Sequence, residues 1–201
     1  MVTAATLLAQ PDIGIQTNAE LLDTLQPWLV KTEMSQLDVL RQGNQTIVHC
    51  EAPSEDALAS FLDQPEVQSA LLLDSNDLAR RIFAWSDEVE PTQTVRCALN
   101  LTLQEGKESE YRRWLGDVDV LETLQTIWRR NGVWRHDVLL TGTTIIAYYE
   151  VETMYSVSKA FREPEALKLL LQELSQILVL DPYVPTLTFY STFHWSRGCS
   201  E

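Results

Sequence analysis

The chain is poor in cysteine, and it has no long apolar run. Its 201 residues include three cysteines, Cys50, Cys97 and Cys199, which are too few and too scattered for a disulfide framework or a zinc knuckle. No apolar stretch approaches the roughly 18 to 20 residues that span a bilayer. The first residues carry no positive charge ahead of an apolar segment, so we expect no secretory signal. These absences predict a cytoplasmic protein without membrane insertion.

Basic residues are also scarce, and the charge is unevenly spread. Lys and Arg number 15 against 29 Asp and Glu, which gives a net charge of -14. Such a surface repels phosphate backbones, so we expect no nucleic-acid binding. Residues 1–90 hold 15 acids and 4 bases, whereas residues 91–201 hold 14 acids, 11 bases and all six tyrosines. We therefore expect two domains, 1–90 and 91–201, joined by a linker near Ser86–Thr94.

The sequence lacks the common catalytic and nucleotide-binding motifs. The sequence has no glycine-rich phosphate loop, no G-x-S-x-G and no C-x-x-C. Its three histidines, His49, His136 and His194, lack the paired spacing of metal ligands. We therefore expect no metal site and no cofactor.

The two halves resemble each other at a single ungapped offset of 99 positions. Leu22–Gln26 aligns with Leu121–Gln125, and Asp38–Leu40 aligns with Asp137–Leu139. The same offset places Gly43 on Gly142, Glu51 on Glu150, and Pro65–Glu66 on Pro164–Glu165. The period is much longer than a solenoid repeat, so the pattern predicts a tandem duplication of one domain. The alternative is a pair of unrelated α/β segments that share common residue types.

Hydrophobic periodicity gives the same element order in both halves. In the second half, residues 95–103, 133–140, 143–151 and 186–195 alternate as strands, and residues 108–131 and 152–178 have helical spacing with a break near Pro164. In the first half, residues 3–10, 36–41, 45–51 and 82–85 are expected strands, and 18–30 and 54–73 are expected helices. Each half is thus a predicted ferredoxin-like β-α-β-β-α-β unit. We expect an α+β fold in which the two units pack sheet to sheet as an intramolecular α+β barrel.

These features resemble a known superfamily, the dimeric α+β barrel proteins. The second half looks like the tetracenomycin-type polyketide cyclases and the L-rhamnose mutarotases, in Ala98–Leu103, the hairpin, Arg162–Glu165 and Thr188–Ser191. The first half is similar to SchA/CurD-like domains, in Asp38–Gly43, Thr46–Val48 and Asp63–Gln68. The resemblance implies a cleft beneath a sheet that holds an aromatic or polyketide-type molecule, with cyclase- or isomerase-like chemistry.

Strand alternation predicts which side chains would line that cleft. If Cys97, Leu99 and Leu101 face the helices, then Arg96 and Asn100 face the other way. The full predicted set is Arg96, Asn100, His136, Tyr148, Tyr190 and His194. We expect His136, Tyr148 and His194 to transfer protons. Arg96, Asn100 and Tyr190 are expected to bind the ligand.

Each of these residues also fits a structural role. A lone histidine on a strand is more often a satisfied core residue than a base, and tyrosine is favoured in strands whatever its function. The basic cluster of Arg129, Arg130 and Arg135 fits either a docking site for an acidic partner or the cation preference of a helix C-terminus. Two function classes therefore stay open: a small-molecule-binding barrel, or a non-catalytic interaction, assembly or regulatory factor that binds an unidentified protein partner.

Overall fold

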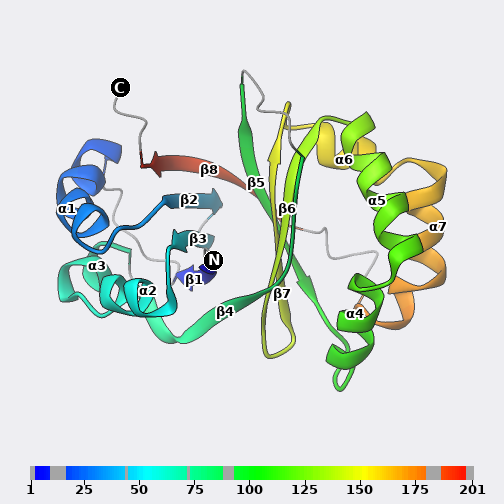
Figure 1. The fold of residues 1–201 in the computed structure, drawn as a ribbon, viewed down its shortest axis with the longest axis horizontal. Coiled ribbons are helices and arrows are strands. Elements are labelled where there is room, and N and C mark those ends of the chain that lie inside the picture. The colour runs from blue at the N-terminus through cyan, green and yellow to red at the C-terminus, as the bar shows by residue number, and fades with distance from the viewer. Residues whose placement is uncertain are drawn as a thin grey trace. The chain divides into compact units, whose positions relative to one another are not determined.

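The protein is described here by a computed structural model that covers residues 3–9, 17–43, 45–71, 73–87, 93–179 and 187–197. It divides into two compact units, unit 1 with Met1–Arg81 and Phe189–Glu201, and unit 2 with Ile82–Thr188. The divisions fall inside two strands, β4 (Leu73–Ser86) and β8 (Leu187–Ser196) (Figure 1). Unit 1 thus takes in the last strand. The expected domains 1–90 and 91–201 stay a prediction, and part of the linker expected near Ser86–Thr94 lies outside the described residues.

Unit 1 is an antiparallel sheet with helices on one face. Its further elements are β1 (Thr3–Ala9), α1 (Asn18–Lys31), β2 (Gln36–Gln42), β3 (Gln45–Ala52), α2 (Glu55–Leu62) and α3 (Pro65–Leu71). The strands lie in the order β4–β1–β3–β2–β8. The first four of them have the strand order of a ferredoxin-like fold.

The helices of unit 1 are fixed by capping and by an apolar stripe. Thr17 and Glu20 form a capping box at the start of α1. Leu21, Leu25 and Leu29 recur every four residues and are buried. They share a core with residues of α2, α3, β2, β3 and β8, namely Phe61, Val67, Leu71, Leu37, Val39, Val48, Cys50 and Phe193. Because strand side chains alternate, the other face of this sheet carries their neighbours in sequence.

Unit 2 has the same plan. Its elements are β5 (Val95–Thr102), α4 (Glu108–Leu115), α5 (Val118–Arg130), β6 (Val133–Thr141), β7 (Thr144–Val151), α6 (Ser156–Ala160), α7 (Pro164–Gln172) and the 3₁₀ turn η1 (Leu174–Gln176). The antiparallel strands lie in the order β5–β7–β6. Val138 and Ile145 pack with Tyr111 and Leu115 of α4 and with Leu178. One face of this sheet is therefore covered by helices too.

The expected element order is confirmed, with three local differences. The helix expected over 108–131 is two helices, because Asp117 caps a new helix with its own carboxylate after Gly116. The helix expected over 54–73 likewise ends at Leu62 and restarts at Pro65. The closing strand of the first half, expected over 82–85, is the long strand β4.

Strand pairing supports the 99-residue offset between the two hairpins. Asp38 pairs with His49 in unit 1, and the equivalent Asp137 pairs with Tyr148 in unit 2. Both turns begin with a glycine at positive φ, 56° at Gly43 and 54° at Gly142. The turn of unit 2 therefore starts at Gly142, one residue later than Thr141, where the sequence pattern put it. The tandem duplication and the sheet-to-sheet packing of the units stay predictions.

Among the described residues, the structure contains no helix that is long and apolar enough to cross a membrane.

Candidate functional site

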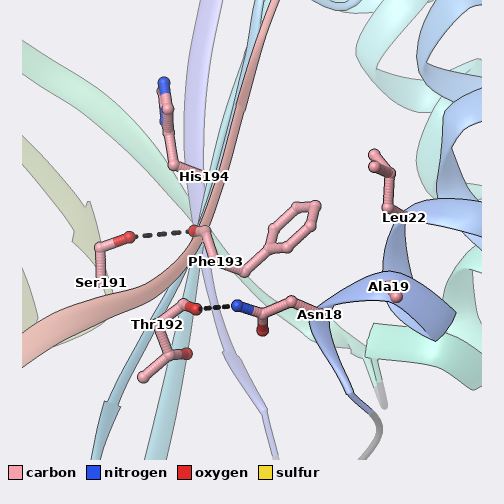
Figure 2. A pocket seen from close by; sticks show the side chains of 7 residues that line it. All are labelled: Asn18, Ala19, Leu22, Ser191, Thr192, Phe193 and His194. Carbon is pink, nitrogen blue, oxygen red and sulfur yellow. Dashed lines mark hydrogen bonds between the residues drawn. The ribbon is translucent and has the colours of Figure 1, made fainter. Parts of the chain in front are cut away.

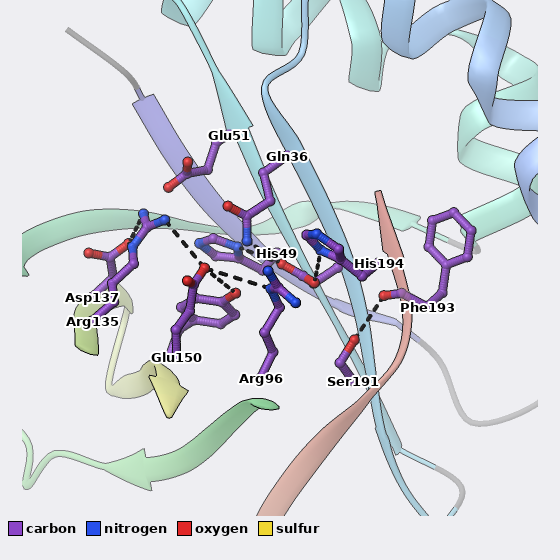
Figure 3. A network of polar contacts seen from close by, with 12 residues as sticks. Gln36, His49, Glu51, Arg96, Arg135, Asp137, Glu150, Ser191, Phe193 and His194 are labelled. Carbon is purple, nitrogen blue, oxygen red and sulfur yellow. Dashed lines mark hydrogen bonds and ion pairs between the residues drawn. The ribbon is translucent and has the colours of Figure 1, made fainter. Parts of the chain in front are cut away.

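Buried polar residues gather on the sheet face of each unit that its helices do not cover. In unit 1 this face carries Asp38 of β2 and His49 of β3, both fully buried, and Gln36, which is nearly so. In unit 2 it carries Arg135, Asp137, Glu150 and Arg96 (Figure 3). Tyr148 of β7 lies on the same face. Buried polar groups are costly unless they are paired, so such clusters mark either a specific internal network or a site.

In unit 1 the polar residues surround one carboxylate. We call Gln36, Asp38, His49 and His194 the Asp38 centre. The Asp38 Oδ1 lies 2.8 Å from Nδ1 of His194 on β8, and Oδ2 accepts a hydrogen bond of 2.6 Å from the Gln36 amide. The Nδ1 of His49 lies 3.7 Å from Oδ2, near enough for a charge interaction. The two oxygens of Asp38 thus have different partners.

The electrostatics of this centre favour an ionised Asp38. Burial by itself opposes ionisation, but the hydrogen bond with His194 and the nearness of His49 outweigh it, so the pKa of Asp38 is lowered. A carboxylate can only accept hydrogen bonds. The proton in the contact with His194 is therefore on Nδ1, which leaves Nε2 of a neutral His194 as an acceptor.

A surface pocket of about 470 Å³ lies beside His194 in unit 1. Its described lining residues are Asn18, Ala19, Leu22, Ser191, Thr192, Phe193 and His194 (Figure 2). His194 is the titratable residue among them, and its side chain is about a quarter exposed, at 27%. The Asn18 amide donates to the Thr192 carbonyl at 2.8 Å, which joins α1 to β8 at the pocket. His194 is therefore one of the residues that line this space, while its ring points away from the ring of Phe193 and contacts Asp38 through Nδ1 (Figure 2).

In unit 2 the centre of the network is Glu150 of β7. Its Oε1 accepts a hydrogen bond of 3.2 Å from the Tyr148 hydroxyl. Arg96 and Arg135 each place a guanidinium nitrogen 3.7 Å from the same oxygen. Arg135 also binds Asp137 on its own strand. Of the predicted residues, Arg96 and Tyr148 therefore lie in one network.

Asn100 lies on the same strand and the same face as Arg96, four residues further along β5. It is half-buried. It thus belongs to the same side of the unit 2 sheet as Arg96 and Tyr148.

The structure corrects the placement of His136. This residue stacks on Tyr149 with ring centroids 4.4 Å apart, and it packs edge-on against Trp128 of α5 at 4.4 Å. It therefore lies on the helix-covered face, on the opposite side of the sheet from Arg96 and Tyr148. Burial lowers the pKa of His136 to about 3, so the imidazole is neutral at pH 7. The expected sharing of one cavity with Tyr148 is wrong, because His136 pairs with Tyr149, and consecutive residues of β7 point to opposite faces.

Tyr190 and His194 also do not share a face. Phe193 pairs with Val39 but Ser191 pairs with Leu40, so β8 has one extra residue at this point. The extra residue is Thr192, whose hydroxyl donates to the Val39 carbonyl at 3.1 Å. Such a bulge reverses the alternation. Tyr190 therefore pairs with Arg41, on the other side of the sheet from Asp38 and His194.

The basic cluster at the end of α5 is paired internally. Arg129 lies 3.4 Å from Asp87, and Arg130 lies 3.2 Å from Glu163. Both arginines are in the last turn of the helix, where cations are favoured. The contacts support the structural interpretation of this cluster.

Asp38, Gln36 and His49 were not predicted from the sequence as parts of a site. The signals were present: Asp38 is an acid between the apolar residues Leu37 and Val39, and His49 is a histidine in the next expected strand. Asp38 and His194 are 156 positions apart in the sequence. They meet because β8 lies beside β2.

Comparisons with known proteins support the fold. No family model matches the chain, and no curated protein matches it in sequence. A structure from Fusobacterium nucleatum, provisionally assigned as a monooxygenase, has a TM-score of 0.61 at 7% identity and covers 94% of this chain and 91% of its own. An anthrone oxidase-like protein has a TM-score of 0.54 at 14% identity, with 98% and 93% covered. A ferredoxin-fold protein from Listeria monocytogenes, related to antibiotic biosynthesis monooxygenases, has a TM-score of 0.50 at 7% identity, with 95% of each chain covered. The chain therefore has a ferredoxin-like α+β fold, and identities this low show the fold alone.

Proposed function

We propose that this protein binds a small aromatic or polyketide-type molecule and that His194 transfers a proton on it. The observation that carries the proposal is the 2.8 Å contact between the buried Asp38 and His194, which lines a pocket of about 470 Å³. Support for the ligand class comes from the fold, which is shared with an anthrone oxidase-like protein, and from the resemblance to polyketide cyclases.

The chemistry needs one base and one buried anion. The Nε2 of neutral His194 takes a proton from a carbon next to a ligand carbonyl, and the C–H electron pair moves into the enolate. The imidazolium is stabilised by the carboxylate of Asp38, as in other acid–histidine pairs. Return of the proton to a different ligand atom completes an isomerisation. In a cyclisation, the enolate carbon attacks a second carbonyl, the C=O π bond opens to an alkoxide, and the imidazolium returns its proton to that oxygen. Neither outcome changes the oxidation state of the ligand.

In unit 2, we propose Arg96, Tyr148 and Asn100 as a separate ligand-contacting set, since they share the sheet face that the helices of unit 2 leave uncovered. We omit His136, because it lies on the other face among aromatic rings. Tyr190 stays a candidate for ligand contact, separate from the Asp38 centre.

Native mass spectrometry of the purified full chain tests ligand binding directly. We expect the purified protein to retain a small molecule. If it retains none, we expect it to bind anthrone as a probe, and the binding is measured by the change in tryptophan fluorescence. It also expects deuterium incorporation at C10 of anthrone above the uncatalysed rate. His194→Gln should abolish this excess while the protein stays folded. Thr123→Ala, a surface change on α5, serves as the control and should retain it.

The alternative function, a non-catalytic protein-interaction role, predicts that the purified protein holds no small molecule. The strongly acidic first half favours an interaction, assembly or regulatory factor. Folded protein that retains no ligand, binds no anthrone and instead co-purifies with a protein partner would overturn the small-molecule proposal.

A further inference from the structure

In both units, the residue two positions before the buried aspartate holds the same oxygen of that aspartate. In unit 1 the Gln36 amide donates to Asp38 Oδ2 at 2.6 Å. In unit 2 the Arg135 Nε donates to Asp137 Oδ2 at 3.0 Å. Residues i and i+2 of a strand lie on one face, which is why this contact forms within a single strand. The 99-residue offset maps Gln36 onto Arg135 and Asp38 onto Asp137, so the two contacts are equivalent.

The two clamping residues differ in charge, and this difference changes what the aspartate can do. Arg135 is a cation, and its contact with Asp137 is an ion pair that neutralises the carboxylate. Gln36 is neutral, so its contact with Asp38 is a hydrogen bond that fixes the plane of the carboxylate and adds no opposite charge. The other oxygen, Oδ1, is then directed at Nδ1 of His194. A histidine base needs an anionic, oriented partner of this kind.

We propose that Gln36 is a positioning residue for the Asp38–His194 pair: its amide holds one oxygen of Asp38 and thereby directs the other oxygen at His194. This inference rests on the proposed function of His194. Gln36 acts through Asp38 and is not among the residues that line the pocket. An arginine at position 36 would convert the Asp38 centre into the paired arrangement of unit 2.

The state of His194 can be measured without any ligand. In protein labelled with ¹⁵N-histidine, the ¹⁵N shifts report which ring nitrogen of His194 carries the proton. The ¹H resonance and solvent-exchange rate of the Nδ1 proton report the strength of its hydrogen bond to Asp38. His194→Gln and Asp38→Asn assign the signal, the first by removing it and the second by removing the anionic acceptor.

Two substitutions test the clamp. Gln36→Arg should neutralise Asp38, so the Nδ1 proton should lose its downfield shift and exchange faster with solvent. Gln36→Met keeps the side-chain length but removes the donor, so the carboxylate is no longer oriented and the same changes are expected to a smaller extent. Gln68→Met on α3 is the matched control. It removes an amide that donates to the Leu62 carbonyl, and it should leave the His194 signals unchanged.

The outcomes separate this proposal from the proposed function. If both Gln36 variants are folded and keep the wild-type Nδ1 resonance and exchange rate, the positioning role is refuted, even if anthrone binds. If the His194 signals change as expected but neither a retained ligand nor proton exchange is found, the clamp stands and the proposed function fails. Loss of anthrone proton exchange in Gln36→Met, together with unchanged anthrone binding, would support both.

Discussion

Acidification should destabilise the protein through His136. This imidazole is enclosed by Trp128, Tyr149 and Phe83, and neither ring nitrogen has a hydrogen-bond partner among the described residues. Protonation would place a cation in this apolar site. Burial accordingly lowers the pKa of His136 from 6.5 to about 3 in the folded protein.

The sign and size of the effect follow from that difference. Below pH 6.5 the unfolded chain binds a proton at this histidine and the folded protein does not, so the unfolding free energy decreases as the pH falls. The slope approaches ~1.36 kcal/mol per pH unit, and the loss levels off near the folded pKa. At about pH 4.5 the loss is about 2.7 kcal/mol relative to neutral pH, a large fraction of typical domain stability.

Three other groups with shifted pKa values, Tyr149 and Cys97 in unit 2 and Asp38 in unit 1, titrate outside this range. Burial raises the pKa of Tyr149 and raises that of Cys97 to about 12, so neither contributes in acid. The pKa of Asp38 is lowered, so its stabilising contribution is lost only below its ordinary value of 3.8. The change between neutral pH and about pH 4.5 therefore contains a distinct His136 term.

Urea unfolding of the wild type and of His136→Phe at both pH values measures this term. Phenylalanine has a similar shape and does not titrate, so the variant should lose about 2.7 kcal/mol less than the wild type on acidification. His194→Gln, in unit 1, is the control. It should retain the decrease in unfolding free energy that His136 causes on acidification. Equal pH dependence in the wild type and His136→Phe would refute the reasoning.

Three further predictions concern stability at neutral pH and are checked by chemical denaturation. Leu25→Ala should cost about 2–5 kcal/mol, because Leu25 is fully buried in the unit 1 core; a loss below ~1 kcal/mol would mean that the site collapses around the cavity. Asp117→Ala should cost about 1 kcal/mol by removing the cap of α5, whereas the exposed Asp119→Ala serves as a comparison. Gly142→Ala should lower the unfolding free energy by about 1–2 kcal/mol, because a residue with a Cβ is strained at its φ of 54°. An added Cβ would meet no atom of the described residues within 4 Å, so the backbone conformation is the expected cause. An unchanged stability would contradict this explanation.

Local sequence signals were sufficient to identify most helices and strands. Alternation in residues 95–103 and 143–151 identified strands, and helical spacing in residues 108–131 identified the region of α4 and α5. These patterns depend on neighbours a few residues apart, which the sequence lists in order. The break at Gly116–Asp117 had a local signal as well, a glycine followed by a capping residue.

The site was less predictable, because it depends on strand register. His194 was identified, but its partner Asp38 is far away in the sequence. His136 was predicted on the wrong face, because only the register of β6 against β7 decides which β6 residues lie on the side of Arg96 and Tyr148. Tyr190 was predicted on the same face of the sheet as His194. The extra residue Thr192 reverses the alternation of side chains, so Tyr190 lies on the opposite face.

The sequence by itself determined the element order, the 99-residue offset between the halves and the acidic character of the first one. These properties are carried by composition and by spacing along the chain. Only the tertiary structure decided that Asp38 meets His194, that Gln36 holds Asp38, and that His136 lies among aromatic rings. The physical reason is that a strand offers its side chains to two faces, and pairing with strands distant in the sequence fixes which residues meet on each face.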